Sequence, residues 1–359
     1  MLVLRILLLP ISFLYGLIMW LRNKSYDLGI FSSQSFDFPV ISVGNLTVGG
    51  TGKTPHVEYI VKLLQPHYAT ATLSRGYRRK TKGFHSANET ATAETIGDEP
   101  LQFYKKFDAL TVLVDEKRAR GVEQCLSQFP EVEAIVLDDA FQHRSIVPGL
   151  NILLIDYSTI GEKQFMLPSG MLREWRRGRR RADLIVVSKS PEVFSPIEAR
   201  RITAILEPEP YQKVFYSYVK YLDLVPFNKE AQRLIDESGL PQLSDFKVLL
   251  FSGIANNLGL KNYLGRISKE VVASEYADHH HFTMADLVRI GKEFRQLVSA
   301  KKLIVTTEKD AMRLQDERLS LVLEEYPVFY LPIEIAFHGE NETFDDQLLT
   351  YVRNNKRSR

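Results

Sequence analysis

The sequence predicts an α/β protein: a P-loop NTPase-type, doubly wound, mostly parallel sheet, a second smaller α/β domain and an N-terminal hydrophobic membrane helix. Three observations lead to this prediction. Short apolar runs alternate with helical stretches over about 170 residues, as in doubly wound sheets. A glycine-rich segment lies between one such run and a helix, and the first twenty residues carry a single charge, at Arg5. The length of 359 residues fits about two domains.

The composition excludes several broad classes of protein. Hydrophobic residues make up 45% of the chain and charged residues 25%, which rules out a disordered, a collagen-like or a polytopic membrane protein. The net charge is only +2, so bulk electrostatics gives no reason to expect nucleic acid as a partner. The single cysteine, Cys125, cannot form an intramolecular disulfide or a cysteine-built metal site, and it fits a reducing compartment.

Residues 1–20 predict a membrane anchor. They read MLVLRILLLPISFLYGLIMW, and as a helix they would be about 30 Å long, the hydrocarbon thickness of a bilayer. Arg22 and Lys24 follow at once, so the positive-inside rule places the rest of the chain in the cytoplasm. A cleaved signal peptide would need a small-residue cleavage site, which does not follow. A buried amphipathic helix is the other alternative, because Arg5, Pro10, Ser12 and Gly16 interrupt the run. Spanning the bilayer and lying in one leaflet both remain open.

The strand and helix pattern divides the chain into an anchor at 1–25, a P-loop kinase domain at 26–212 and a smaller α/β domain at 213–359. Apolar runs without alternation are typical of strands buried on both faces of a parallel sheet. In the P-loop domain we expect a helix at 54–64 and strands at 39–43, 69–73, 110–114, 134–137, 150–155 and 184–187. In the smaller domain we expect a helix that begins at Thr283 and strands at 247–252, 303–306 and 328–331.

The segment GNLTVGGTGKTP at 44–55 predicts a phosphate-binding P-loop, because it joins a predicted strand to a predicted helix. Its glycines let backbone N–H groups approach phosphate oxygens. Lys53 would reach the β- and γ-phosphates, and the Thr54 hydroxyl would take a Mg²⁺ position. Thr47 stands where the pattern has glycine, and a glycine-rich turn before an ordinary helix is the alternative. The predicted nucleotide-binding residues are Thr47, Val48, Gly49, Gly50, Thr51, Gly52, Lys53 and Thr54.

Two acidic motifs are candidates for catalysis. Asp138 and Asp139 end the apolar run AIVLDD, the pattern that supplies a carboxylate to Mg²⁺ in P-loop proteins. A strand that ends in Asp is common by itself, and a Mg²⁺ ligand is favoured here because the motif follows a P-loop. The motif GDEP at 97–100 places Asp98 and Glu99 at a helix start, where acids also act simply as caps. Catalysis is favoured because a P-loop kinase requires an acid to accept the proton of the acceptor hydroxyl.

Two further motifs are rich in cationic side chains. In DHHH at 278–281, consecutive residues point in different directions, so proton handling is favoured over a metal site, and a polar loop is the alternative. The basic run REWRRGRRR at 173–181, together with Arg75, Arg78, Arg79 and Lys80, predicts a cationic surface. Near a membrane anchor, anionic lipid headgroups or a phosphorylated substrate are favoured over nucleic acid. For most individual arginines a solvated surface remains the alternative.

The order of the motifs closely resembles tetraacyldisaccharide 4′-kinase, the lipid A 4′-kinase family of Gram-negative bacteria. The motifs are VGNLTVGGTGKTP, SRGY at 74–77, GDEP, LDDAFQH, LPSGMLRE, FSGIAN, DH at 278–279 and TTEKD at 306–310. The resemblance runs from the hydrophobic helix to about residue 340, and residues beyond carry no motif. Departures are modest: Ser169 and Met171 stand where alanine and proline are usual, and Trp175 replaces a frequent proline.

This resemblance implies a kinase that uses ATP and Mg²⁺. It implies transfer of the γ-phosphate to the 4′-hydroxyl of a tetraacyldisaccharide 1-phosphate, a lipid A precursor, at the cytoplasmic face of the inner membrane, forming lipid IVA. Asp98 would be the base-like residue with His279 as its partner. Glu99, Asp138 and Asp139 would surround Mg²⁺. The expected contacts to substrate or phosphate are Arg75, Gln142, His143 and Arg173.

Two other functions compete with this interpretation. A membrane-tethered P-loop ATPase of the positioning or partitioning class would need no base for an acceptor hydroxyl, so Asp98 and His279 weigh against it. A non-catalytic lipid-binding module would leave the intact GTGKT sequence and Asp138 unexplained. We expect no nucleic acid and infer no obligate protein partner.

Overall fold

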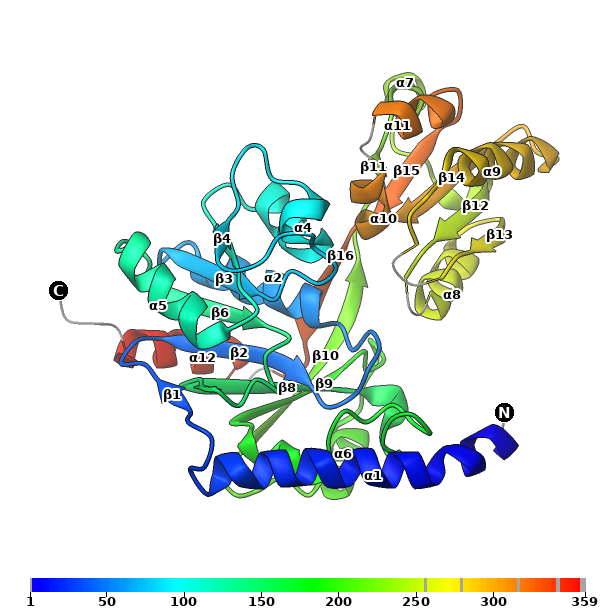
Figure 1. Cartoon of the computed structure of the whole chain (residues 1–359). Coiled ribbons are helices and arrows are strands. Elements are labelled where there is room, and N and C mark those ends of the chain that lie inside the picture. Colours follow the sequence, from blue (N-terminus) through cyan, green and yellow to red (C-terminus); the bar gives the residue numbers. More distant parts are fainter. Residues whose placement is uncertain (1, 255–256, 278–279, 315–316, 340–342, 356–359) are drawn as a thin grey trace. The chain divides into compact units, whose positions relative to one another are not determined.

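The computed structural model describes residues 2–254, 257–277, 280–314, 317–339 and 343–355, which form two compact units. Unit 1 holds residues 1–219 and 335–359, and unit 2 holds residues 220–334. Figure 1 follows the chain through both units in sequence colours. Each unit is an α/β structure around its own sheet, as the sequence predicts.

In the described part of the chain, unit 1 is built on a nine-stranded sheet in the order β16-β10-β9-β8-β2-β6-β3-β5-β4. The strands from β10 to β5 pair in parallel, and β4 pairs with β5 in antiparallel. A separate parallel pair joins β1 (Gln34–Ser35) to β7 (Ile146–Val147). The strands of the large sheet are β2 (Val40–Asn45), β3 (Thr70–Ser74), β4 (His85–Ser86), β5 (Thr111–Val114), β6 (Ala134–Asp138), β8 (Leu150–Asp156), β9 (Leu184–Ser188), β10 (Lys213–Tyr221) and β16 (Ile333–Phe337).

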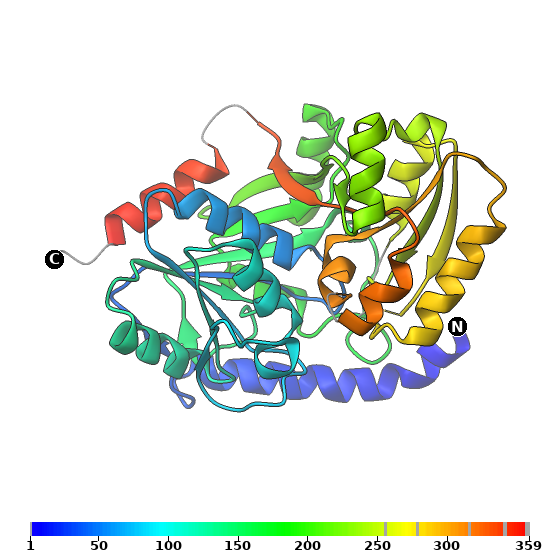
Figure 2. The ribbon, with the colours of Figure 1, turned by 90° about the horizontal axis from the view of Figure 1, so that it is seen from above.

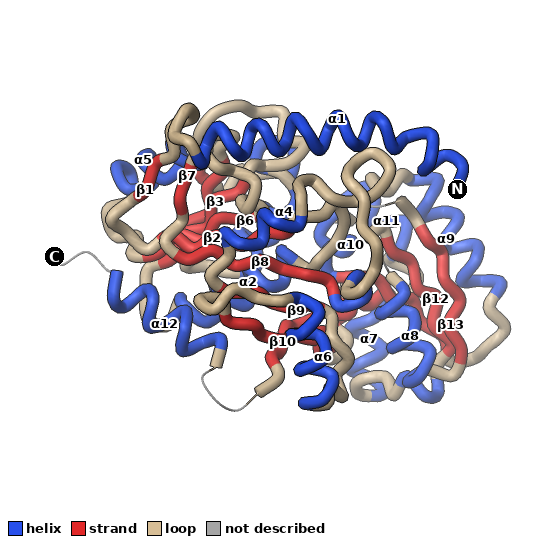
Figure 3. Tube along the Cα trace, turned by 90° about the horizontal axis from the view of Figure 1, so that it is seen from below, coloured by secondary structure: helices blue, strands red, loops and turns tan. Residues whose placement is uncertain are grey.

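Helices cover both faces of this sheet, which explains why strands such as β2 are buried along their whole length. One apolar core joins the sheet to α2, α4 and α12, and two others join it to α5 and to α6 with α1. Figures 1 and 3 show α1 as the long helix that runs along one side of this unit. The helices are α1 (Leu2–Asp27), α2 (Lys53–Leu64), α3 (Ala93–Ile96), α4 (Asp98–Lys106), α5 (Arg118–Gln128), α6 (Pro196–Leu206) and α12 (Phe344–Asn355), with 3₁₀ turns η1 (Tyr157–Thr159) and η2 (Arg176–Arg181).

Unit 2 has a five-stranded sheet among its described residues, in the order β11-β15-β14-β12-β13. Its strands are parallel except β11, and apolar cores line both faces. Thr283 caps α9 with Asp286 in a capping box, as predicted. The elements are β11 (Val225–Pro226), α7 (Lys229–Ser238), η3 (Leu243–Asp245), β12 (Lys247–Ser252), α8 (Leu258–Ile267), β13 (Glu270–Glu275), α9 (Met284–Gln296), β14 (Lys302–Thr307), α10 (Glu308–Arg313), α11 (Glu317–Leu323) and β15 (Val328–Leu331).

The boundary between the two units differs from the expected division at 212 and 213. β10 pairs with β9 and β16 lies beside β10, so residues 213–219 and 335–359 belong to unit 1. The returning segment is fixed by α12, in which Phe344, Leu348 and Val352 follow one helix face and are fully buried against the large sheet. Figure 2 shows this C-terminal helix in red beside α2. The helix of the expected anchor also packs within unit 1.

Candidate active site

The predicted site residues of unit 1 collect at the carboxyl ends of its parallel strands. Asn45 ends β2, Asp138 ends β6, and Ser188 ends β9. The chain runs from β2 to β3 on one side and continues to β8 on the other, so β2 marks a topological switch point. Ligands of open α/β sheets bind at this position, and the P-loop follows β2 directly.

The P-loop between β2 and α2 exposes a helix N-terminus built on glycine. Gly52 is the N-cap residue of α2 at φ 85°, a left-handed conformation that disfavours other residues. Among the described residues no side chain caps this end of α2. Its free N–H groups and the helix dipole are therefore available to an anion such as phosphate.

Lys53 and Thr54 open α2 and point to acidic partners. The Lys53 Nζ atom lies 3.4 Å from Asn45 Oδ1 and 3.7 Å from Asp139 Oδ1. The Thr54 hydroxyl donates to Glu99 Oε1 at 3.2 Å, which joins α2 to the first turn of α4. The two segments are far apart in sequence, and this contact brings the GDEP motif to the P-loop.

Asp138 carries an orphaned oxygen at this site. Its side chain is buried, Oδ2 lies 3.5 Å from the Ser74 hydroxyl, and Oδ1 has no hydrogen-bond partner among the described residues. Burial raises the pKa of Asp138 above its usual range, and the neighbouring carboxylates of Glu99 and Asp139 raise it further. A hard cation would supply the missing contact, so the residues fit Mg²⁺.

These residues suit a Mg²⁺ ion that has few protein ligands. Within the described residues no three His, Cys, Asp or Glu side chains gather around one metal position. Mg²⁺ in P-loop proteins keeps several water ligands and is shared with nucleotide phosphates. Thr54 and Asp138 suit that kind of site.

Asp139 differs from Asp138 in its partners and its charge. It follows β6 at φ 46°, a conformation uncommon for a residue with a side chain. The Nη1 atom of Arg173 lies 3.1 Å from each of its carboxylate oxygens. Burial raises the pKa of Asp139, but Lys53 and Arg173 outweigh burial and hold the pKa below its ordinary value. Asp139 is therefore an ionised acid between two cations.

Gln142 and His143 lie beside these groups. The Gln142 side chain donates to the backbone carbonyl of Asn45 and to Glu174 Oε1, and its own oxygen accepts from Arg173 at 3.4 Å. Burial lowers the pKa of His143 to about 4, and the nearby arginines lower it in the same direction. His143 is thus neutral at physiological pH.

Asp98 and the exposed Arg75 are brought to the same edge by their loops. Asp98 opens α4 directly after Gly97, which has φ 98°. A Cβ on Gly97 would lie 3.2 Å from the backbone of Gly76 and Tyr77, so the GDEP and SRGY motifs pack backbone to backbone. A side chain at position 97 would crowd this contact, and the φ of 98° disfavours one as well.

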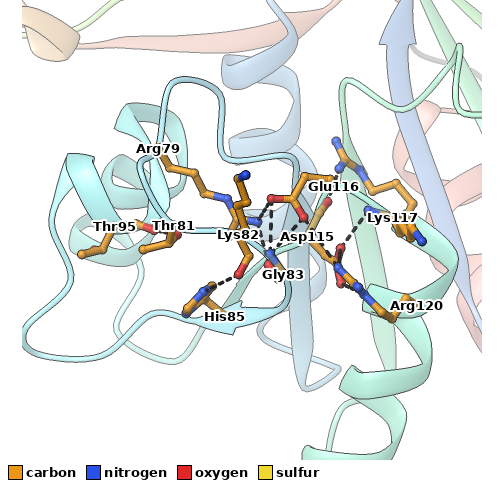
Figure 4. Close-up of polar contacts among 11 residues, drawn as sticks. Arg79, Thr81, Lys82, Gly83, His85, Thr95, Asp115, Glu116, Lys117 and Arg120 are labelled. Carbon is orange, nitrogen blue, oxygen red and sulfur yellow. Dashed lines mark hydrogen bonds and ion pairs between the residues drawn. The ribbon is translucent and has the colours of Figure 1, made fainter.

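The loop that follows Arg75 is tied down by an internal ion pair (Figure 4). Arg79 donates to Glu116 Oε1 and to the Gly83 carbonyl, both at 2.6 Å, while the Gly83 N–H donates to the same carboxylate. Burial raises the pKa of Glu116, but its hydrogen bonds outweigh burial and lower it. These contacts therefore fix the loop to Glu116.

The predicted partner of Asp98, His279, lies outside the described residues, as does Asp278. Both belong to unit 2. The next residue, His280, contacts Asp286 Oδ2 through Nε2 at 3.0 Å. The pairing of Asp98 with His279 stays a prediction.

Comparison with known proteins now decides the family. The profile described as "LpxK: Tetraacyldisaccharide-1-P 4'-kinase" matches residues 4–353. The chain belongs to the tetraacyldisaccharide-1-P 4′-kinase family.

Relatives match along nearly their whole lengths. A tetraacyldisaccharide 4′-kinase of Bacteroides thetaiotaomicron is 42% identical over 356 residues, which cover 97% of this chain and 93% of the relative. One of Flavobacterium johnsoniae is 42% identical over 352 residues, which cover 98% of each. The crystal structure of LpxK from Aquifex aeolicus in complex with ATP is similar with a TM-score of 0.71 at 29% identity, covering 99% of this chain and 100% of that one.

In this member of the tetraacyldisaccharide-1-P 4′-kinase family, the structure adds site residues that the sequence analysis missed. Ser188 donates to the carbonyl of Thr51 at 2.9 Å, and Lys189 donates to the carbonyl of Gly50. The Lys189 ammonium also pairs with Asp156 at 2.8 Å. Their position directly after the predicted strand at 184–187 was a usable signal, because strand ends meet at one edge of a parallel sheet.

Arg118 and Glu174 were missed for a different reason. Arg118 is fully buried, and its guanidinium donates to the carbonyls of Asp115 at 2.6 Å and Asp138 at 3.1 Å. Glu174 is 1% exposed and accepts from Arg181 at 2.7 Å. Both stand in stretches that look like solvated charged sequence, so no local pattern reveals their burial.

Proposed function

We propose that this chain transfers the γ-phosphate of ATP to the 4′-hydroxyl of a tetraacyldisaccharide 1-phosphate, the lipid A precursor, forming lipid IVA. The observation that carries the proposal is the meeting of Lys53, Thr54 and the orphaned Asp138 oxygen at the switch point of the sheet. Family membership supplies the acceptor class.

Each residue has a proposed part in this transfer. The P-loop N–H groups and Lys53 bind the β- and γ-phosphates, and Thr54 and Asp138 would hold Mg²⁺ with Glu99 and Asp139 beside them. Bound Mg²⁺ supplies neutralisation of the charge on the phosphate oxygens. Arg75, Gln142, His143 and Arg173 are proposed to contact the acceptor or its phosphate.

Asp98 is proposed to accept the proton of the sugar hydroxyl, with His279 sharing it. A lone carboxylate with a pKa near 4 is a weak base, and a neighbouring imidazole orients it and shares the proton. Groups that act as one unit lose activity non-additively, so Asp98→Ala, His279→Ala and the double variant should have similar, severely reduced rates. Losses that multiply in the double variant would show independent action, with His279 as a substrate contact.

Helix α1 is proposed to lie in the cytoplasmic leaflet of the inner membrane. It is long and apolar enough to cross a membrane, with a mean hydropathy of 1.6 and 11% of that window buried. Its residues Ser12, Gly16 and Asn23 face unit 1, while Phe13 and Leu17 on the other side are exposed. A helix packed lengthwise on unit 1 suits one leaflet better than a perpendicular span.

The basic run contributes less to lipid binding than its composition indicates. Arg173 pairs with Asp139, Arg180 with Glu209 at 2.6 Å, and Arg181 with Glu174. These three arginines form ion pairs within unit 1. We propose that anionic headgroups are met by the remaining exposed arginines and by the cations near the end of α1.

The test is transfer of labelled γ-phosphate. The full chain, Mg²⁺ and labelled ATP are incubated with extracted lipid A precursor, and the label is followed into lipid and into free phosphate. Label in the lipid supports the kinase. Label released only as free phosphate would instead identify an ATPase, and no turnover in either channel would favour a non-catalytic lipid-binding module.

A further inference from the structure

The face of α1 that meets the rest of unit 1 carries hydrogen-bonding groups beside the apolar contacts of Tyr15 and Met19, which an anchor alone does not require. A helix that only holds a protein at a membrane needs an apolar outer face. On α1 the inward positions form a stripe of small and polar residues at helical spacing. The stripe comprises Ser12, Tyr15, Gly16 and Asn23, and each of these residues makes a hydrogen bond to the segment 169–175.

Those hydrogen bonds are specific in geometry. The Ser12 hydroxyl contacts Ser169 Oγ at 2.7 Å, and the Tyr15 hydroxyl donates to the Arg173 carbonyl at 3.0 Å. The Trp175 indole donates to the Gly16 carbonyl at 2.9 Å. The helix therefore fixes both the backbone and the side chains of the segment that carries Arg173.

The same segment is bonded to the P-loop through its backbone. The Val48 N–H donates to the Met171 carbonyl at 2.7 Å, and the Arg173 N–H donates to the Leu46 carbonyl at 2.8 Å. Segment 169–175 thus lies between α1 and the P-loop, hydrogen-bonded to both.

Glu174 completes this connection with a buried carboxylate. One oxygen accepts from Asn23 Nδ2 of α1 at 2.7 Å, and the other accepts from Arg181 at 2.7 Å and from Gln142 at 3.3 Å. A Cβ on Gly178 would lie 2.8 Å from the carboxylate, so the backbone closes tightly around it. A buried charge that accepts three hydrogen bonds has one favoured position.

From Glu174 the contacts continue to the phosphate-binding lysine. Gln142, held by Glu174, bonds the carbonyl of Asn45 at the start of the P-loop and accepts from Arg173. Arg173 in turn bridges Asp139, which pairs with Lys53. The path from α1 to Lys53 is one continuous set of polar contacts within unit 1.

We propose that Glu174 is a positioning residue through which Asn23 of helix α1 holds Gln142 and Arg173 in register with the P-loop. The helix is then part of the catalytic scaffold in addition to its proposed membrane role. This inference rests on the proposed kinase function, because its consequence is a rate of phosphate transfer. Disturbing Asn23 lowers kcat without changing attachment to lipid.

The test is a pair of single variants and their combination, each made in the full chain. Asn23→Asp places two carboxylates together and should lower kcat at least about tenfold. Glu174→Gln removes the charge that pairs with Arg181 and leaves one oxygen in place of two for the donors around it, so kcat should also fall. In the combined variant an amide at 174 faces a carboxylate at 23, which restores a hydrogen bond, so kcat should recover to within about threefold of wild type. Asn23→Ser removes the hydrogen bond without adding charge, so its kcat should lie between the values of wild type and Asn23→Asp.

Two controls distinguish a loss of kcat through positioning from a loss through weaker membrane attachment or general destabilisation. Ser25→Ala removes a hydrogen bond that lies within α1, from Ser25 Oγ to the Leu21 carbonyl, and should leave kcat unchanged. Flotation with vesicles of anionic and zwitterionic phospholipid should be equal for all variants. A purely structural role would lower the melting temperature without the recovery of kcat in the combined variant.

The outcomes decide between the claims. Transfer by wild type and Ser25→Ala, loss in both single variants and recovery in combination support the positioning role. Full activity of Asn23→Asp and Asn23→Ser beside an active wild type overturns it while leaving the kinase intact. No transfer by wild type overturns the proposed function and this inference with it.

Discussion

The Arg173 guanidinium bridges Asp139, with Nη1 at 3.1 Å from both carboxylate oxygens. Asp139 also lies 3.7 Å from the Lys53 ammonium. Its neighbour Asp138 has a buried oxygen without a partner among the described residues. The two adjacent acids therefore have different roles: Asp139 pairs with Lys53 and Arg173, and Asp138 is the proposed Mg²⁺ ligand.

This division predicts different responses to Mg²⁺. Asp138→Asn should weaken the apparent affinity for Mg²⁺ by at least about tenfold, because a neutral amide is a poorer ligand. Asp139→Asn should lower kcat while the Mg²⁺ dependence of the rate stays within about threefold of wild type, because it releases Lys53 and Arg173. Titration of Mg²⁺ against the transfer rate measures both. Equal losses of Mg²⁺ affinity in the two variants would contradict the division.

Lys189 predicts a further effect on nucleotide binding. Its ammonium holds the Gly50 carbonyl and pairs with Asp156. Lys189→Ala should weaken ATP binding by about tenfold, because the P-loop loses a charged hydrogen bond that shapes it. Calorimetric binding of ATP checks this, with the exposed Lys163→Ala as the matched control. Unaltered affinity in Lys189→Ala would remove the residue from the site.

His56 gives unit 1 a dependence on pH. It is buried, with Nδ1 at 2.6 Å from the Gly52 carbonyl and Nε2 at 2.9 Å from the Ser217 hydroxyl. Burial lowers the pKa of His56 from 6.5 to about 4. Between these values the unfolded chain binds more protons than the folded one, so stability falls as the pH drops from 6.5 toward 4, by about 3 kcal/mol in total.

Urea unfolding at pH 7 and pH 4.5 measures this loss. His56→Gln should be less stable than wild type at pH 7 and should lose less stability between the two pH values. The exposed His67→Gln should retain the wild-type dependence on pH. An identical loss in His56→Gln and wild type would show that His56 is not the group that titrates.

The outer face of α1 predicts membrane attachment independently of the site. Leu14 and Ile18 are 57% and 54% exposed, and Leu14→Glu with Ile18→Glu should reduce binding to phospholipid vesicles at least about tenfold. Binding of ATP should not change, because neither residue lies on the inward stripe. Ile197→Glu, at an apolar site on α6 that is 79% exposed, is the control. Retained flotation of the double variant would contradict the leaflet proposal. If the remaining binding is lost at high salt, it is electrostatic and comes from the arginines.

Local patterns in the sequence were enough for most of the fold. The runs at 247–252 and 328–331 are strands with those bounds, and the other predicted strands differ at their ends by one or two residues. These strands are continuous apolar runs covered on both faces, which is the strongest strand pattern available. β10 and α12 were missed as parts of unit 1, because their membership depends on pairing with distant strands.

The site residues could be predicted where they belong to short sequence motifs. Thr54 of the P-loop contacts Glu99 of the GDEP motif, and Asp138 ends a strand of the same parallel sheet, while the roles of these residues stay predictions. Glu174 and Arg118 could not be found, since their function depends on burial by α1 and β6. A charged residue in a charged stretch gives no local sign of such burial.

The most direct test of the account is Lys53→Ala. Lys53 is the cation placed at the P-loop by Asn45 and Asp139, and its loss removes charge stabilisation of the transferred phosphate. The account predicts that transfer of labelled γ-phosphate to the lipid falls at least about a hundredfold, which corresponds to about 2.7 kcal/mol, while the melting temperature stays close to that of wild type. A folded Lys53→Ala protein that transfers phosphate at a near-normal rate would contradict it.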